Sequence, residues 1–139
     1  VSKGHKTTAN ILKRKAFTVS MAEAGQVVAC DYVGIVSGNK VADKFARAGF
    51  HATRSEFVDA PLIDELSVAM ECRLKDYNPE TSILRGEIVN VSVDERVLGE
   101  NGKVDASKVV PIIFDPFNND YLKVGEKVGN AFSDGKILK

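Results

Sequence analysis

The chain has 139 residues, of which 44% are hydrophobic and 27% charged, a length and balance that fit one domain with its own core. Nineteen basic residues cancel nineteen acidic ones, so no global field attracts nucleic acid or a membrane, and any anion site must be local. Apolar stretches such as VVPIIF fall far short of the roughly 20 residues that a membrane-spanning helix needs.

The two cysteines indicate a reducing environment. Cys30 and Cys72 lie far apart in the sequence and form neither a CxxC motif nor a metal-type spacing. The opening residues carry no signal-peptide pattern. We therefore expect a single domain over residues 1–139, located in the cytoplasm, with no metal site and with neither nucleic acid nor a membrane as a partner.

The chain opens with a predicted helix followed by a strand. Thr7 or Thr8 is the expected N-cap of the helix, because a hydroxyl there can accept an unpaired backbone N–H, and the helix should end near Lys15. The sequence AFTVS, residues 16–20, then predicts a strand.

Two further helices are expected next. Ser20 and Glu23 match the S-x-x-E capping box and predict a helix from about Met21, through AEAGQVVACDY, to the break at VSG. Ser37 is the expected cap of another helix that ends at Gly49, with apolar residues on one face at Val41, Phe45 and Ala48.

After residue 49 the hydrophobic period changes from helix to strand. SVAMECRLK, residues 67–75, alternates between apolar and mostly polar side chains, which predicts a strand with one buried face. The face expected to be buried carries Val68, Met70, Cys72 and Leu74. The opposite face carries Ala69, Glu71, Arg73 and Lys75.

A longer strand follows, and its pattern slips at a glycine. Leu84 and Ile88 share one face, whereas Val89, Val91 and Val93 take the other, so a bulge is expected near Gly86. GENGK then predicts a turn, DASKVV a helical turn, PIIF a short strand and DPFNND a loop. Helices early and antiparallel strands late favour a mainly β barrel or sandwich with helical insertions over a doubly wound sheet.

The cluster at the start of the chain allows two interpretations. Hydroxyls, lysines and a histidine directly before a helix can cradle a phosphate, since the first N–H groups of the helix are free. Alternatively, the cluster is a polar strand end beside a capped helix. Neither GxxxxGK[ST] nor GxGxxG is present. The cluster consists of Ser2, Lys3, His5, Lys6, Thr7 and Thr8.

No catalytic acid–base set emerges from the sequence. Cys30 has no histidine near it in the sequence, so a structural thiol is favoured over a nucleophile. The neighbouring acids at 64–65 and 94–95 do not share a face, which makes them poor acid–base partners. We therefore predict no catalytic residue.

Several blocks together resemble a known family. VSKGHKTTANI, FTVS, CDYVGIVSGNKVADKF, APLIDE, RGEIVNV and Y..VGEKVG occur in the order found in flavin reductase-like, flavoredoxin-type proteins. The resemblance runs through nearly the whole chain. It implies a split β-barrel of the Greek-key, FMN-binding type and a homodimer with FMN near the subunit interface.

The resemblance also implies which residues meet the cofactor. By position, Ser2, Lys3, His5, Thr7 and Thr8 become contacts at the phosphate end of FMN. The insertion around the flavin supplies a second group, namely Cys30, Asp31, Ser37 and Lys44. The implied activity is an NAD(P)H-dependent flavin reductase. One alternative is a non-enzymatic FMN electron carrier with a redox protein partner, and another is a dimeric interaction domain that has lost its cofactor.

Four departures from the family pattern bear on nicotinamide handling more than on flavin binding. Relatives carry further strands before the opening block, so we expect a barrel that lacks its first strands. Ser2 stands where many relatives have arginine. Thr81 stands where many have histidine, and Ser20 where asparagine is common.

Overall fold

Short helices and seven strands follow one another along the computed structural model, which describes residues 1–139 in full. The first half contains α1 (Lys6–Arg14), β1 (Ala16–Ser20), η1 (Ala24–Gln26), α2 (Val27–Ile35), α3 (Lys44–Arg47), β2 (Ala52–Arg54) and β3 (Pro61–Ile63). The second half contains β4 (Val68–Asn78), β5 (Ile83–Val93), η2 (Glu95–Val97), α4 (Ala106–Val109), β6 (Ile112–Asp115), β7 (Asp120–Lys123) and η3 (Asp134–Leu138).

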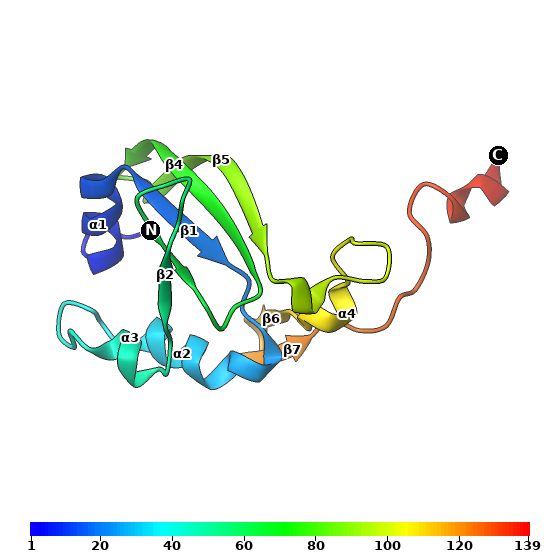
Figure 1. Ribbon diagram of the computed structural model, residues 1–139, viewed down its shortest axis with the longest axis horizontal. Helices are drawn as coiled ribbons and strands as arrows, with labels where there is room; N and C mark the ends of the chain where they lie inside the picture. The colour runs from blue at the N-terminus through cyan, green and yellow to red at the C-terminus, as the bar shows by residue number, and fades with distance from the viewer.

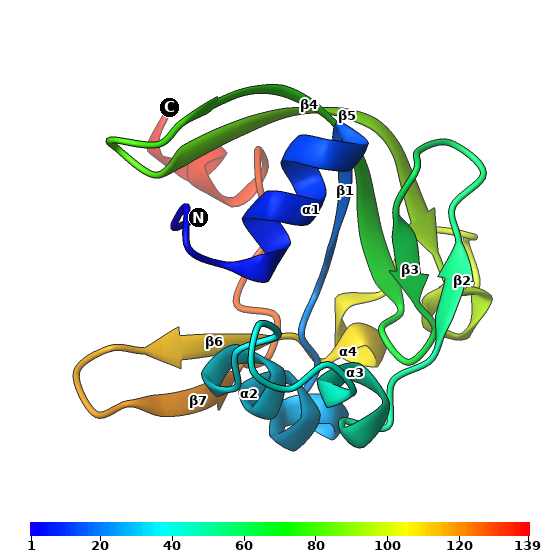
Figure 2. The same cartoon turned by 90° about the vertical axis from the view of Figure 1, so that its left-hand side faces the viewer.

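The strands form three antiparallel sheets that do not close on one another. β1, β4 and β5 make a three-stranded sheet in the order β1-β4-β5, while β2–β3 and β6–β7 are separate hairpins. The long strands β4 and β5 curve together over the molecule, with α1 at one side and α2 and α3 at the opposite end (Figures 1 and 2). The prediction of a mainly β fold with helical insertions is confirmed. None of the helices has the length and apolar character to cross a membrane.

Several predicted elements are found at their expected places. AFTVS forms β1, residues 99–103 form a turn, residues 106–109 form the helical turn α4, and β6 follows. α2 ends at Ile35, before the predicted break. Gly49 lies after α3 with a φ of 75°, a conformation that favours glycine over residues with a Cβ.

The predicted bulge near Gly86 is confirmed, but the extra residue belongs to the partner strand. Leu74 pairs with Gly86 and Asp76 with Arg85, so Lys75 of β4 is left over. A second irregularity leaves Val89 unpaired in β5. A Cβ on Gly86 would lie 2.4 Å from Cζ of Phe17, so this position needs glycine for close packing.

The burial of β4 follows the prediction only in part: Cys72 of the expected face is buried, but so are Ala69 and Glu71, which were expected on the outer face. Ala16, Val58 and Ala60 form a small core with Val89 packed against it, under the segment that joins β2 to β3. On the opposite face Val19, Ile88 and Val91 remain about half exposed.

Glu71 is the clearest correction. It was expected on the outer face of its strand, but its exposed fraction is 0%. Its carboxylate accepts hydrogen bonds from Ser55 Oγ, Ser92 Oγ and Asn90 Nδ2, the last at 2.7 Å. Burial by itself would raise the pKa of Glu71, and the hydrogen bonds from Ser55, Ser92 and Asn90 outweigh it, so the pKa lies below its ordinary value.

The N-cap predictions for the first two helices are wrong. α1 begins at Lys6 with His5 as its N-cap, so Thr7 and Thr8 lie inside the first turn. α2 begins only at Val27, because the Glu23 carboxylate does not close a capping box. It accepts instead from the backbone N and the Oγ of Ser67, both at 2.6 Å.

The third predicted helix is also shorter than expected. Residues 38–40 and 42–43 form turns, and α3 covers only Lys44–Arg47, with Asp43 at its N-cap position. Ser37 accepts a hydrogen bond from the backbone N of Asn39 at 3.3 Å, which makes it part of the turn rather than a helix cap.

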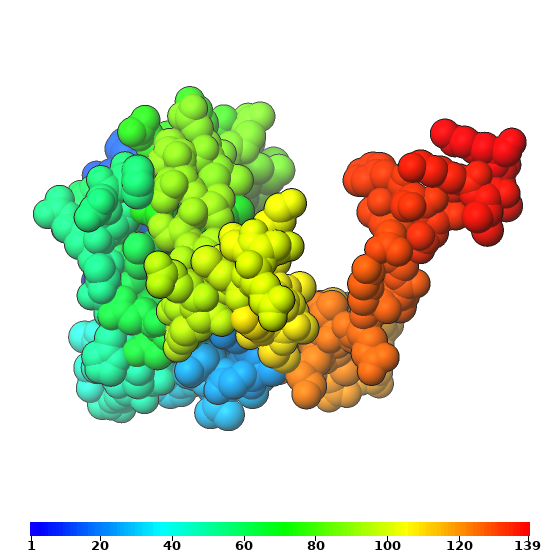
Figure 3. Space-filling view, turned by 45° about the vertical axis from the view of Figure 1, so that its right-hand side comes forward, coloured from blue at the N-terminus to red at the C-terminus, as the bar shows by residue number.

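Residues 125–139 extend away from the rest of the molecule. The backbone N of Val124 donates to Pro111 O at 3.3 Å, and beyond it the hydrogen bonds of the chain stay within residues 125–139. We call this segment the C-terminal arm. Figures 1 and 3 show it projecting from the end of β7 to the η3 turn at the C-terminus.

Candidate functional site

Residues 1–5 form a loop, called here the N-terminal loop, that is held at several points. Thr8 Oγ1 donates to Ser2 O at 2.7 Å, and the His5 backbone N donates to the same oxygen at 3.1 Å. From outside, Asn39 Nδ2 donates to Gly4 O at 2.9 Å. The loop therefore has a fixed path into α1.

The helix that follows the N-terminal loop starts without a capping side chain. No side chain accepts from its first turn, and the first intrahelical bond is donated by the Ala9 backbone N. The N–H groups of Lys6, Thr7 and Thr8 are thus left without an acceptor, as expected at an uncapped helix start. The first turn contains no acidic residue.

Two lysines and a histidine surround this helix start, and none of them forms an ion pair. Lys3, His5 and Lys6 are exposed, and none of the six salt bridges involves them. Thr7 is exposed as well. Free N–H groups, a hydroxyl, lysines and the positive end of the helix dipole are the donor set that binds a phosphate dianion. The residues present therefore fit a phosphorylated ligand.

Thr8 plays a different part from Thr7. Its exposed fraction is 1%, and its hydroxyl hydrogen is used in the bond to Ser2 O. Of the two threonines expected at the phosphate, the structure leaves Thr7 open to solvent and uses Thr8 to hold the N-terminal loop.

Ser37 and Lys44 lie beside the N-terminal loop, in supporting positions. The turn at residues 37–40 touches the loop through the Asn39 bond, and it touches the start of α1 through Gly38, whose Cβ position would be 3.4 Å from Lys6 Cβ. The Lys44 ammonium donates to Val33 O and Val36 O at 2.8 and 2.9 Å, which suits the negative C-terminal end of α2.

Cys30 and Asp31 make their contacts elsewhere. Asp31 Oδ1 accepts from Tyr121 Oη at 2.9 Å and so ties α2 to β7. The same bond raises the pKa of Tyr121. Burial, with a further contribution from the Glu23 charge, raises the pKa of the Cys30 thiol. A protonated thiol is a poor nucleophile, in keeping with the structural role expected for it.

A groove that the sequence did not reveal starts at Thr7. It has a volume of about 870 Å³ and runs along α1, between β1, α3 and the β2–β3 hairpin. One wall is the face of α1 formed by Thr7, Asn10, Ile11 and Arg14, and Phe45 of α3 faces the groove from another element. The spacing of those four α1 residues was the only local signal for it.

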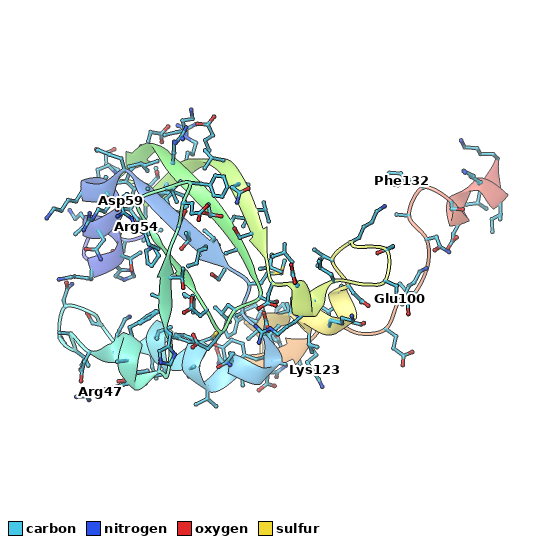
Figure 4. The ribbon with its side chains drawn as sticks, in the orientation of Figure 1. Arg47, Arg54, Asp59, Glu100, Lys123 and Phe132 are labelled. Atoms are coloured by element: carbon cyan, nitrogen blue, oxygen red, sulfur yellow. The ribbon has the colours of Figure 1, made fainter.

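Charged residues lie at the end of the groove away from Thr7. Arg14 Nη1 forms an ion pair with Asp59 Oδ2 at 2.9 Å, joining α1 to the segment after β2. Arg54 also lines the groove, and Figure 4 shows Arg54 and Asp59 beside α1. A volume of this size, with apolar and polar lining residues, is in the range of small-molecule sites.

Known proteins resemble this chain in sequence and in fold. The family profile described as "Flavin reductase like domain" matches residues 1–114. The flavoredoxin of Desulfovibrio vulgaris (Miyazaki F) is 40% identical, with a TM-score of 0.90 over 97% of this chain and 73% of that chain. The flavoredoxin from Methanosarcina acetivorans is 32% identical, with a TM-score of 0.88 over 100% of this chain and 74% of that chain.

A curated relative also matches this chain in sequence. An uncharacterized protein of Aquifex aeolicus (strain VF5) is 32% identical over 108 residues, which cover 76% of this chain. The match spans 55% of that relative, so this chain corresponds to about half of its length. The solved relatives confirm the fold expected from the sequence, a split barrel with helical insertions, whose sheets are not closed in this chain.

Proposed function

Because the chain belongs to the flavin reductase like domain family, we propose that it binds FMN and acts as a redox flavoprotein. The observation that carries this proposal is the uncapped, positively charged start of α1 on a fixed loop. FMN differs from riboflavin by a phosphate, and a phosphate is the group that this helix start can hold.

The residues divide into those that hold the phosphate and those that shape its surroundings. The N–H groups of Lys6 and Thr7, the Thr7 hydroxyl and the Lys3 ammonium bind the phosphate oxygens, with Ser2 and His5 beside them. Thr8, Ser37 and Lys44 keep the N-terminal loop and the adjoining turn in position. The groove along α1 offers Asn10, Ile11 and Phe45 to the remainder of the cofactor.

The proposed reaction is the reduction of flavin by NAD(P)H. Hydride acceptance is chemistry that the flavin supplies when bound. The protein has to orient the rings and exclude water, so a site without a general acid–base pair is compatible with this reaction. The family to which the chain belongs supports this reading.

A second candidate is an electron carrier that exchanges electrons with a redox protein partner. It is favoured by the 40% identity to a flavoredoxin. In both cases we propose a homodimer with FMN near the subunit interface.

One anaerobic titration separates the two candidates. The purified protein is loaded with FMN, and NADH or NADPH is added without any other protein while the flavin absorbance is followed. Prompt bleaching supports the reductase. Bleaching only after a partner reductase is added supports the carrier. A protein that gains no flavin absorbance with excess FMN contradicts both and favours an interaction domain without cofactor.

A further inference from the structure

The segment that joins β2 to β3, residues 55–60 and called here the β2–β3 loop, supplies part of one wall of the groove along α1. Asp59 and Ala60 of the loop line the groove, and their neighbours Arg54 and Pro61 do so as well. Figure 4 shows Arg54 and Asp59 beside α1. The shape of the groove therefore depends on what fixes the path of this loop.

Ser55 organises the β2–β3 loop from its first position. Its Oγ accepts hydrogen bonds from the backbone N of Phe57 and of Val58, both at 3.0 Å. Its own backbone N donates to Ala60 O at 3.1 Å, which closes the loop. Ser55 is 5% exposed, so these bonds are shielded from water. One buried hydroxyl thus sets the path of most of the loop.

The hydroxyl hydrogen of Ser55 is donated to Glu71 of β4. The Glu71 side chain is fully buried, and none of the six salt bridges involves it. Its carboxylate accepts instead from three neutral groups, on Ser55, Asn90 and Ser92. A buried carboxylate is costly unless hydrogen bonds compensate it. The loop and the sheet therefore share one buried network.

The charge of Glu71 fixes the direction of the bonds in this network. The hydrogen bonds hold the pKa of Glu71 below its ordinary value, so the side chain is ionised at neutral pH. An ionised carboxyl can only accept. The Ser55 hydrogen therefore points at Glu71, which leaves the Ser55 oxygen free to accept from Phe57 and Val58.

The other contacts of the β2–β3 loop fix its position less closely. The ion pair between Arg14 and Asp59 is exposed, and exposed ion pairs contribute little. Val58 and Ala60 pack against Ala16 in the small core, but apolar contact has no preferred direction. The bond from Ser55 to Glu71 is the buried, directional contact that ties the loop to β4.

We propose that Glu71 is a positioning residue for the groove along α1. Acting through Ser55, its carboxylate fixes the β2–β3 loop in the path that places Asp59 and Ala60 on the groove wall. This inference rests on the proposed function, in which the groove takes the part of FMN beyond the phosphate. Riboflavin shares that part, so disturbing Glu71 should weaken both flavins alike.

Two variants of the full chain test this inference. Ser55→Ala removes only the link between loop and sheet, whereas Glu71→Met removes every acceptor but keeps a side chain of similar length. Each should raise the Kd of FMN and of riboflavin by a common factor of at least about 10, measured by fluorescence quenching. Without flavin, amide hydrogen exchange at Phe57 and Val58 should become at least about tenfold faster. If Glu71→Met does not fold, Ser55→Ala carries both measurements.

Val97→Ala is the matched control. Val97 is 4% exposed in η2 and does not line the groove, so this substitution lowers the stability of the protein at a distance from the β2–β3 loop. Both dissociation constants and the exchange at Phe57 and Val58 should stay unchanged. The double variant Ser55→Ala/Glu71→Met should bind flavin no more weakly than Glu71→Met, because both substitutions act through the same hydrogen bond.

The outcomes separate this inference from the proposed function. A parent that binds neither flavin contradicts the proposed function, and the exchange at Phe57 and Val58 then decides alone whether Glu71 fixes the loop. Unchanged dissociation constants in both variants, or a loss confined to FMN, overturn the positioning role. Equal weakening by Val97→Ala overturns it too, since general loss of stability would then explain the result.

Discussion

A single negative charge at the start of α1 should separate the stability of the helix from its ability to bind FMN. In Thr7→Asp a carboxylate replaces the exposed hydroxyl in the first turn. A negative charge near the N-terminus of a helix stabilises it by about 0.3–1 kcal/mol. The free protein should therefore melt at the parent's temperature or slightly above it.

The same carboxylate should strongly oppose the phosphate. Losing a hydrogen bond to a charged group costs about 1.5–3 kcal/mol. Repulsion between two unit charges about 4 Å apart adds up to about 4 kcal/mol near a protein surface. The variant should bind FMN at least about 3 kcal/mol more weakly, which is a factor of about 100 or more in Kd.

Riboflavin, which has no phosphate, is the internal reference. FMN and riboflavin are titrated by fluorescence quenching with the parent and the variant. Thr7→Asp should weaken FMN alone and bring its Kd toward that of riboflavin. Asn101→Asp is the control, since it adds the same charge in the 99–103 turn and keeps the acceptor for Lys103 N.

Two results would refute this reasoning. If FMN binds the variant as tightly as the parent, the phosphate does not lie at the start of α1. If FMN and riboflavin weaken equally, the substitution has damaged the site as a whole. Thr8→Val should behave differently from Thr7→Asp. Removing the hydrogen bond from Thr8 to Ser2 O should lower the melting temperature of the free protein.

Three further changes test the packing and charges around the sheet. The lowered pKa of Glu71 means that its contribution to stability is present above about pH 4.3 and is lost as pH falls through the folded value; Glu71→Gln should cost about 1–3 kcal/mol in urea unfolding at pH 7 and flatten the acid limb, and an unaltered acid limb would contradict this. Gly86→Ala should cost about 1–3 kcal/mol through overpacking against Phe17, and a double-mutant cycle with Phe17→Ala should show strong coupling, whereas additive effects would count against the contact. The hydrogen bond that His51 Nδ1 donates to the Glu65 carboxylate raises the pKa of His51, so this pair favours the folded state below about pH 6.5 and the contribution fades as pH rises through the folded value; Glu65→Gln should return the NMR titration midpoint of His51 to its ordinary range, and an unmoved midpoint would exclude the pairing.

Local sequence patterns predicted where the strands and helices lie better than they predicted which faces of those elements are buried. The alternation in SVAMECRLK identifies β4, because side-chain direction in a strand depends only on neighbouring residues. Which face is covered depends on the segment after β2, which brings Ser55 to Glu71 across 16 positions. The capping box at Ser20 failed for the same reason, since Glu23 finds Ser67, 44 residues away.

The candidate site was predictable only in part. The polar cluster before α1 is contiguous in sequence, so its residue types offer a phosphate cradle as one of two interpretations, the other being a polar strand end beside a capped helix. The different parts played by Thr7 and Thr8 follow from the bend of the N-terminal loop, which no residue pattern specifies. The groove joins α1 to β1, α3 and the β2–β3 hairpin, and Phe45 and Arg54 enter it only through tertiary folding.

The bond from Asn39 to Gly4 has a consequence for the order of events in unfolding. It joins segments 35 residues apart, and few buried side chains support the α2–α3 region that supplies it. Segments with little buried surface open at lower free energy than the sheet. Heating should therefore loosen residues 36–40 first and free the N-terminal loop, so that any bound cofactor departs while β1, β4 and β5 are still paired.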